Sequence, residues 1–321
     1  MKTLNLAYPE RSDIKYTIQK FPDGQQNVVI EEVSLRRASG TLPCKYECDC
    51  INPGNYPYQI KARLNDFKDL ELIICAVASL RELGVEEIHL YAPYILGARS
   101  DRKFEDGGNN YIKSVIAPII NSLNFKTVTC IDPHSNVLEA CIKGFRKESN
   151  LNLVKNAINS IYMKVYDNKP RHSTIAWEFN NTILNKFILV SPDAGASKKI
   201  YKIAEQIGYK GDIITCSKER DSEGKLTRTV VPIYGNHFEK DIIIIDDICD
   251  GGATFINIAK EIKNSSDGSR FKGRLFLVVT HGIFSKGLTE LAQYFDGIYT
   301  TNSYKNCNQL ELLKVKQLNV F

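Results

Sequence analysis

Apolar and polar residues alternate in this chain in blocks typical of successive strands and helices. From Leu64 to Leu83 apolar residues recur at helical spacing, and Gly84 follows where a helix C-cap stands. Strand patterns at Glu87–Tyr91 and Phe125–Ile131 enclose a second helical pattern at Tyr111–Leu123. Strands that alternate with helices, with polar loops after the strands, predict a parallel α/β sheet with ligands at the strand ends.

The second half of the chain repeats this alternation after a segment, Lys143–Asn185, that reads as helical at first and then as polar and irregular. Two α/β domains are therefore expected, one over residues 1–149 and one over residues 150–321. The helical patterns are Lys198–Ile207 and Phe255–Ile262. The strand patterns are Phe187–Val190, Asp212–Cys216, Ile242–Ile245, Arg274–Thr280, Ile298–Thr301 and Leu310–Val315.

Composition excludes some classes of protein but does not identify this one. The 321 residues are 43% hydrophobic and 25% charged, typical of a globular protein. A net charge of +5 is too weak and too scattered to predict nucleic-acid binding, and no stretch is long enough to span a membrane. Without a signal-peptide core near its start, the chain is expected to be cytoplasmic. Nine cysteines with scattered spacing fit free thiols in a reducing compartment.

Three of these cysteines, Cys44, Cys48 and Cys50, cluster in the segment CKYECDC. Three thiols could hold a metal, but no fourth ligand stands at zinc-site spacing. An irregular cysteine-rich segment without metal is the favoured interpretation, and the role of the cluster stays open.

The richest candidate chemistry lies in the stretch DIIIIDDICDGGAT, residues 241–254. Four isoleucines predict a strand buried on both faces, which ends in Asp246 and Asp247, with Asp250 on the turn. Gly251 and Gly252 then lead into a helix, and a glycine turn at a helix N-terminus presents amide donors that suit phosphate. Carboxylates beside such a turn suit sugar hydroxyls or a phosphate-borne Mg²⁺. An ordinary strand–loop–helix connection with exposed acids is the alternative.

Three further segments carry chemistry of the same kind. Asp132 and His134 follow one predicted strand and Asp193 follows another, and oxygen and imidazole ligands suit Mg²⁺. His134 taken singly also has a structural alternative, since histidines at strand ends commonly serve packing. Lys218 and Arg220 lie in a charged, hairpin-like segment, which is either a solvated loop or a basic flap that neutralises charge during phosphoryl transfer.

These motifs together resemble those of the ribose-phosphate pyrophosphokinase (phosphoribosyl pyrophosphate synthetase) family. The matching segments are PDG at 22–24, ARSDRK at 98–103, DPHS at 132–135, SPDAG at 191–195, KER at 218–220, DDICDGGAT at 246–254 and THGIFS at 280–285. The resemblance implies two phosphoribosyltransferase-like α/β domains. It also implies Mg²⁺-dependent transfer of the β,γ-diphosphate of ATP to the 1-hydroxyl of a 5-phosphorylated ribose, with release of AMP.

The resemblance also assigns roles to individual positions. It makes Lys218 and Arg220 the flap cations, His134 and Asp193 the Mg²⁺ ligands, and Asp132 their support. His134 thereby also joins the catalytic set. The implied ribose-phosphate contacts are Asp246, Asp247, Asp250, Gly251, Gly252, Ala253 and Thr254. The implied ATP contacts are Phe21, Asp23, Arg99 and Asp101, and the loop with Phe21 and Asp23 reaches a neighbouring subunit in this family, so a homodimer or higher homo-oligomer is expected.

One departure from the family concerns the acceptor. Gly251 stands where the family usually has a threonine, and a wider phosphate turn could admit ADP-ribose, as in relatives from phages and bacteria that rebuild NAD. Ribose 5-phosphate and ADP-ribose therefore both stay open as acceptors. A phosphoribosyltransferase is less favoured because it would need only one such domain. A non-catalytic regulator is less favoured because His134, Lys218 and Arg220 are all present.

Overall fold

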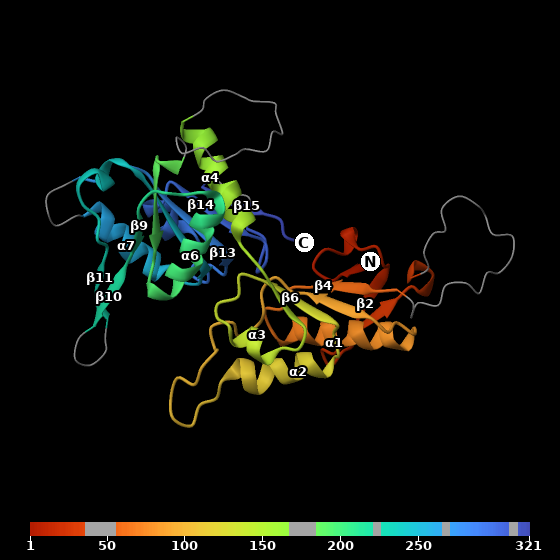
Figure 1. Cartoon of the computed structure of the whole chain (residues 1–321). Helices are drawn as coiled ribbons and strands as arrows, with labels where there is room; N and C mark the ends of the chain where they lie inside the picture. The colour runs from red at the N-terminus through yellow and green to blue at the C-terminus, as the bar shows by residue number, and fades with distance from the viewer. Residues whose placement is uncertain (36–55, 167–183, 221–225, 265–269, 308–313) are drawn as a thin grey trace. The chain divides into compact units, whose positions relative to one another are not determined.

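We describe a computed structural model of the chain over residues 1–35, 56–166, 184–220, 226–264, 270–307 and 314–321 (Figure 1). It divides into two compact units, which we treat separately. Unit 1 comprises Met1–Glu148 together with Phe321, and unit 2 comprises Ser149–Val320. The cluster Cys44, Cys48 and Cys50 lies outside the described residues.

Unit 1 is built on a five-stranded parallel sheet in the order β1-β4-β5-β6-β7. Its strands are β1 (Lys2–Asn5), β4 (Tyr58–Lys61), β5 (Ile88–Tyr91), β6 (Thr127–Ile131) and β7 (Phe145–Glu148). Its helices are α1 (Phe67–Glu82), the π-helical turn η4 (Ile112–Ile116), α2 (Ala117–Ser122) and α3 (Val137–Cys141), with 3₁₀ turns η1 (Pro9–Arg11) and η2 (Glu32–Leu35).

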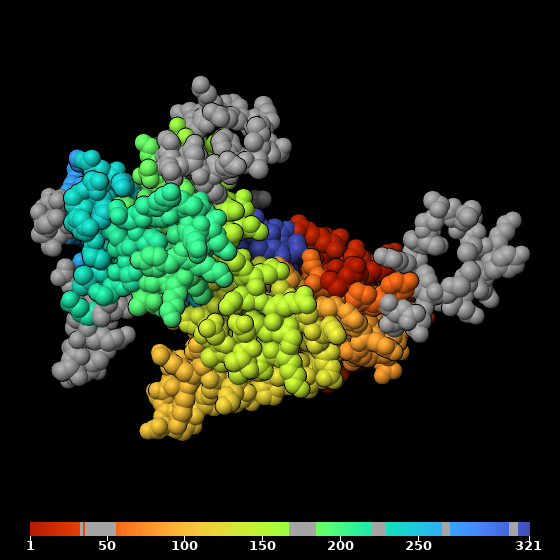
Figure 2. Space-filling model, in the orientation of Figure 1, coloured from red at the N-terminus to blue at the C-terminus, as the bar shows by residue number. Residues whose placement is uncertain are grey.

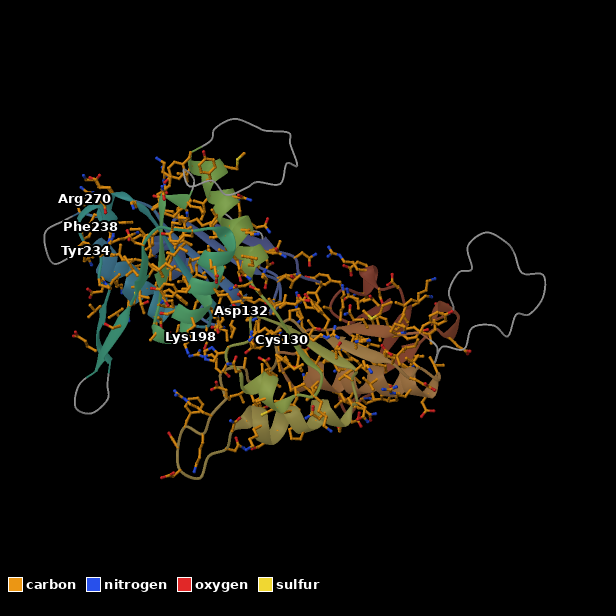
Figure 3. The ribbon with its side chains drawn as sticks, in the orientation of Figure 1. Cys130, Asp132, Lys198, Tyr234, Phe238 and Arg270 are labelled. Atoms are coloured by element: carbon orange, nitrogen blue, oxygen red, sulfur yellow. The ribbon has the colours of Figure 1, made fainter. Side chains whose placement is uncertain are left out.

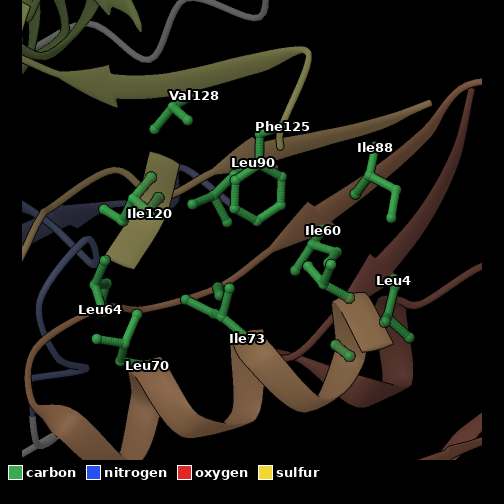
Figure 4. Packing of buried hydrophobic residues seen from close by; sticks show 14 of the residues in the cluster. Leu4, Ile60, Leu64, Leu70, Ile73, Ile88, Leu90, Ile120, Phe125 and Val128 are labelled. Atoms are coloured by element: carbon green, nitrogen blue, oxygen red, sulfur yellow. The ribbon is translucent and has the colours of Figure 1, made fainter. Parts of the chain in front are cut away.

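Helix α1 forms where its sequence predicts, with both ends fixed by local signals. Asp66 caps its N-terminus by accepting the backbone N–H groups of Lys68 and Asp69, so the helix begins at Phe67 rather than at Leu64. Gly84, at φ 80°, follows the C-cap in the left-handed conformation that glycine permits. The apolar face of α1 packs against the strands, as Figure 4 shows for its buried residues Leu70, Ile73 and their neighbours.

Two segments extend from the parallel sheet of unit 1. The antiparallel hairpin of β2 (Tyr16–Lys20) and β3 (Gln26–Ile30) carries Phe21 and Asp23 on its exposed turn. The loop after β5 contains Arg99 and Asp101, and its central part projects from the body of the unit (Figures 1 and 2). Phe104 in this loop is exposed. Both segments hold residues that the resemblance assigns to ATP binding.

Unit 2 has a six-stranded parallel sheet in the order β15-β14-β13-β12-β8-β9 and a separate antiparallel hairpin, β10-β11. Its strands are β8 (Phe187–Ser191), β9 (Ile213–Thr215), β10 (Ser217–Arg220), β11 (Leu226–Val230), β12 (Asp241–Cys249), β13 (Leu275–Gly282), β14 (Gly297–Thr301) and β15 (Val315–Leu318). Its helices are α4 (Leu151–Val165), α6 (Ala194–Ile207), α7 (Ala253–Lys263) and α8 (Thr289–Tyr294), with the 3₁₀ turn η5 (Gly235–Glu239).

The isoleucines of β12 show why this strand is central. Ile242 and Ile244 lie in a core formed with α7, whereas Ile243 and Ile245 lie in a second core formed with α4 and α6. Because side chains alternate across a strand, a continuous apolar run requires helices on both faces of the sheet. The predicted fold class, two largely parallel α/β domains, is confirmed.

Three sequence predictions about elements are wrong in detail, and a fourth lies partly outside the described residues. The segment after Lys143 begins with a strand, β7, and the helix starts only at Leu151. Helix α6 begins at Ala194, four residues before the predicted start at Lys198. The last described strand, β15, begins at Val315, and residues 310–313 of the predicted strand Leu310–Val315 lie outside the described residues. The predicted helix Tyr111–Leu123 divides into a π-helical turn and α2.

Two of these differences have a local physical cause. Strand β7 is exposed on most of its four residues, so it carries no apolar period that could identify it. In α6 the small residues after Asp193 carry little apolar signal, although Asp193 caps the helix.

Across the described residues, no helix is long and apolar enough to cross a membrane.

Candidate functional site

The predicted sugar-phosphate segment lies at the carboxyl end of β12, which continues past the isoleucines through Cys249. Asp246 and Asp250 are partly exposed, whereas Asp247 is buried. The Oδ2 atom of Asp247 lies 2.7 Å from the Nζ atom of Lys199 on α6. A buried carboxylate needs such a charged partner to remain ionised. Asp247 thus ties β12 to α6, while Asp246 and Asp250 are the more accessible acids.

The turn after Asp250 takes the shape expected of an anion site. Gly252 is the N-cap of α7 with φ 82°, and no side chain caps that helix. Its positive φ favours glycine, and a Cβ atom at position 252 would lie 3.1–3.2 Å from three side-chain carbon atoms of Leu291, closer than ordinary contact. The first N–H groups of a helix have no intrahelical acceptor and carry the positive end of its dipole. Thr254 stands in the first turn of this helix, beside those donors.

A second loop supports this turn through backbone hydrogen bonds. The N–H groups of Ile283 and Phe284 donate to the carbonyl oxygen of Cys249, at 2.9 and 3.1 Å, and that of Ser285 donates to Asp250 at 3.3 Å. Phe284 is buried and has a positive φ of 45°, a strained conformation for an aromatic residue. The loop after β13 is therefore held firmly against the end of β12.

Position 251 differs from position 252 in what it permits. No positive φ requires glycine at Gly251, and an added Cβ atom would meet the side chain of Lys286 at 3.4–3.6 Å, which is ordinary contact. Gly251 is therefore not demanded by the backbone, and its missing side chain leaves room that the stem of Lys286 borders.

Cys249 lies between the acidic residues of the site but is not suited to nucleophilic catalysis. Burial raises the pKa of its thiol to about 12, with the carboxylates of Asp246 and Asp250 adding to the rise. The thiolate, which is the reactive form, is then almost absent at neutral pH.

We expect iodoacetamide at pH 7.5 to alkylate Cys249 far more slowly than the half-buried Cys141 and Cys307. Peptide mass spectrometry after timed labelling of the native chain measures this. Rapid alkylation of Cys249 under native conditions would contradict a protonated, buried thiol. Full modification of all thiols in denaturant is the control.

Asp193 has a structural task in addition to the predicted metal role. Its Oδ1 atom accepts the N–H groups of Gly195 and Ala196, at 3.0 and 3.2 Å, and so caps α6. Ser191 donates its hydroxyl to the carbonyl oxygen of Asp193 at 2.6 Å, which fixes the turn. These contacts orient the carboxylate, and its part in binding Mg²⁺ remains a prediction.

Asp132 and His134 lie at the end of β6 in unit 1. Asp132, labelled in Figure 3, is buried and has a positive φ of 42°, and its N–H donates to the carbonyl oxygen of Glu148 at 2.8 Å. Aspartate tolerates this conformation better than most residues, but its persistence marks a turn held by its surroundings. His134 is exposed two residues further on. Among the described residues, no three His, Cys, Asp or Glu side chains are grouped to hold a metal.

The remaining predicted residues lie on exposed segments. Phe21 and Asp23 are exposed on the β2–β3 turn, Arg99 is exposed, and Asp101 is partly exposed. Lys218 and Arg220 belong to β10 of the hairpin, but their side chains lie outside the described part of the chain. The hairpin itself forms as the sequence predicts, with Lys218 paired to Thr229.

Two lysines near the turn escaped prediction. Lys199 lies in the predicted helix Lys198–Ile207, and only the strand order of the sheet shows that β8, which leads into α6, pairs with β12. Lys286 follows the segment THGIFS and carries no signal in the sequence beyond its proximity to that motif.

No family model matches this chain. Two curated proteins named ribose-phosphate pyrophosphokinase are 28% and 29% identical to it, from Mycoplasmopsis pulmonis over 262 residues and from Saccharolobus solfataricus over 247 residues. These alignments cover 80% and 77% of this chain and 72% and 71% of those proteins. A third, from Thermosipho africanus, is 24% identical over 94% of this chain and 82% of its own length.

A solved structure has the same fold. The phosphoribosylpyrophosphate synthetase of Mycobacterium smegmatis aligns with a TM-score of 0.70 over 100% of this chain and 95% of that protein, at 16% identity. At this identity the structural match bears on the fold alone, whereas the sequence relatives bear on the family.

Proposed function

On the premise that this chain is related to the ribose-phosphate pyrophosphokinases, we propose that it transfers the β,γ-diphosphate of ATP to the 1-hydroxyl of a 5-phosphorylated ribose and releases AMP. The relatives that carry this name align over 77–94% of the chain. The observation that carries the proposal is the turn at Gly252, which joins three aspartates to an uncapped helix N-terminus.

The chemistry of that segment fits a sugar phosphate. The first N–H groups of α7 and the hydroxyl of Thr254 suit a 5-phosphate, because they offer donors and a positive dipole without a competing capping side chain. Asp246 and Asp250 suit ribose hydroxyls, which donate to carboxylates. Asp247 is paired with Lys199, and its proposed role is mainly structural, because this ion pair positions β12.

ATP is the proposed donor and Mg²⁺ the proposed metal, with His134 and Asp193 as its ligands and Asp132 as their support. An imidazole and a carboxylate suit a cation that keeps several of its waters and is bound largely through substrate phosphates. When bound, Mg²⁺ neutralises charge on the phosphates. Arg99, Asp101, Phe21 and Asp23 are proposed to contact ATP, and the exposed position of Phe21 is compatible with contact to a second subunit.

The reaction needs no covalent intermediate with the protein. The oxygen of the ribose 1-hydroxyl attacks the β-phosphorus of ATP. The bond between the β-phosphorus and the oxygen that bridges it to the α-phosphorus breaks, and AMP leaves with that bridging oxygen. Phosphoryl transfers of this kind are accelerated mainly by positioning and by charge neutralisation. The protonated state of Cys249 agrees with a site that uses no thiol nucleophile.

ADP-ribose is the second candidate acceptor, and Gly251 is the observation that favours it. The missing side chain leaves room at the phosphate turn, and neither the conformation of residue 251 nor its neighbours demand glycine. The product would then be ADP-ribose 1-pyrophosphate, which suits a route that rebuilds NAD.

Steady-state assays with Mg-ATP and each acceptor test both candidates. We expect release of AMP in an amount equal to the pyrophosphorylated product, identified by mass spectrometry, with one acceptor strongly preferred. Turnover of ribose 5-phosphate alone would exclude ADP-ribose as the acceptor. If neither acceptor led to AMP release although circular dichroism showed the chain to be folded, the proposed function would be overturned.

A further inference from the structure

Lys286 borders the phosphate turn in a position that no motif assigns to binding. Its Cγ, Cδ and Cε atoms lie 3.4–3.6 Å from the place that a Cβ atom on Gly251 would occupy. The side chain is exposed, and within the described part of the chain its ammonium group makes no hydrogen bond or ion pair. A lysine stem therefore lies along the open side of Gly251, with its charge one bond beyond Cε.

The backbone holds this lysine in place. Ser285, its neighbour, donates to the carbonyl oxygen of Asp250, the neighbour of Gly251. On the other side, the N–H of Gly287 donates to the carbonyl oxygen of Phe284 at 3.0 Å, which closes the turn. The terminal ammonium of Lys305 also donates to Phe284, at 3.3 Å. The main chain around Lys286 is thus fixed against the phosphate turn, while its side chain keeps several rotatable bonds.

The charge of Lys286 adds to what the helix already offers. The N-terminus of α7 supplies donors and a partial positive charge sufficient for one phosphate. A lysine ammonium is a strongly hydrated point charge on a flexible stem, suited to an anionic group that lies outside the turn rather than within it. With no side chain on Gly251 between them, the turn and the ammonium can bind neighbouring phosphates.

We propose that Lys286 is a specificity-determining residue that binds the second phosphate of an acceptor whose 5-phosphate is part of a diphosphate ester. The proposal rests on the proposed function, because it assigns the first phosphate to the turn at Gly252. It makes the pair Gly251 and Lys286 the feature that favours a ribose diphosphate ester over ribose 5-phosphate.

The test compares Lys286→Met, Lys286→Arg and Lys260→Met with the unchanged chain, using ADP-ribose and ribose 5-phosphate as probes. Lys260 is exposed near the C-terminal end of α7, so its substitution removes the same charge from the same unit away from the turn. We expect Lys286→Met to raise KM for ADP-ribose about fivefold, the effect of one exposed charge pair, with kcat unchanged. KM for ribose 5-phosphate should change less than about twofold, since a side chain outside the turn adds little there.

Lys286→Arg should restore most of the lost affinity, and Lys260→Met should leave both acceptors unaffected. Equal losses for the two acceptors, or no loss for ADP-ribose, would overturn the role of Lys286 in specificity. Turnover of ribose 5-phosphate by a chain that does not bind ADP-ribose would overturn it too, while upholding the proposed function.

Calorimetric titration of each acceptor without ATP separates the two proposals further. If the chain binds ADP-ribose in a Lys286-dependent manner but transfers no diphosphate, the proposed reaction fails and the binding role of Lys286 stands. If it binds neither acceptor, both proposals fail.

Discussion

Lys218→Ala should lower kcat on the order of 10²–10³ while leaving the affinity for the sugar-phosphate acceptor nearly unchanged. Removal of one well-placed charge from a site that stabilises a transition state typically has an effect of this size. The charge distribution of the transition state develops on the diphosphoryl group only during transfer. A cation that contacts the group in the transition state therefore affects kcat rather than acceptor binding. Steady-state kinetics together with acceptor titration measure the two quantities separately.

Glu219→Ala is the matched control for this prediction, because Glu219 is an exposed residue of the same strand, β10. It tests whether changes in the hairpin alone disturb the site, and we expect a change in kcat of less than about threefold, as for most substitutions on an exposed surface. Normal turnover by Lys218→Ala would remove the hairpin from the mechanism. Equal losses in both variants would indicate a general requirement for an intact hairpin.

The central part of the fold could be predicted because its signals are local and strong. The run Ile242–Ile245 requires a strand covered on both faces, and the structure divides these four side chains between two cores. Helix α1 has an apolar period, a capping aspartate and a terminal glycine, all visible in the sequence. Strand β7 could not be predicted because its pairing with β6, rather than any apolar period, defines it.

The candidate site was predictable as a set of strand ends but not as a set of contacts. Acids at the carboxyl end of β12 follow from the parallel sheet, whereas the ion pair between Asp247 and Lys199 depends on the packing of α6 beside β12. Asp193 shows a similar limit, because its sequence position suits both a metal ligand and an N-cap, and the structure shows the cap. The contact of Lys286 with position 251 joins two loops that only the fold brings together.

Gly252→Ala should reduce kcat/KM for the acceptor by on the order of 10², because misplacement of a binding group by about 1 Å is enough for such a loss. A Cβ atom at position 252 would stand 3.1–3.2 Å from Leu291 in a backbone with φ 82°. Relief of that contact requires the Leu291 side chain to give by a few tenths of an ångström or the turn to shift, and a shift of the turn moves the first N–H groups of α7. Kinetics with varied acceptor, together with acceptor titration, measure the loss.

Gly208→Ala separates this effect from loss of stability. Gly208 has φ 71° at the C-cap of α6, and no atom lies within 4 Å of its added Cβ position, so alanine brings the same kind of backbone strain without a steric contact. Both variants should lose about 1–2 kcal/mol in the free energy of unfolding, measured in urea. Only Gly252→Ala should lose activity. If Gly208→Ala lost as much, strain anywhere in unit 2 would explain the result. If Gly252→Ala bound its acceptor normally, the 5-phosphate would have to bind away from the N-terminus of α7.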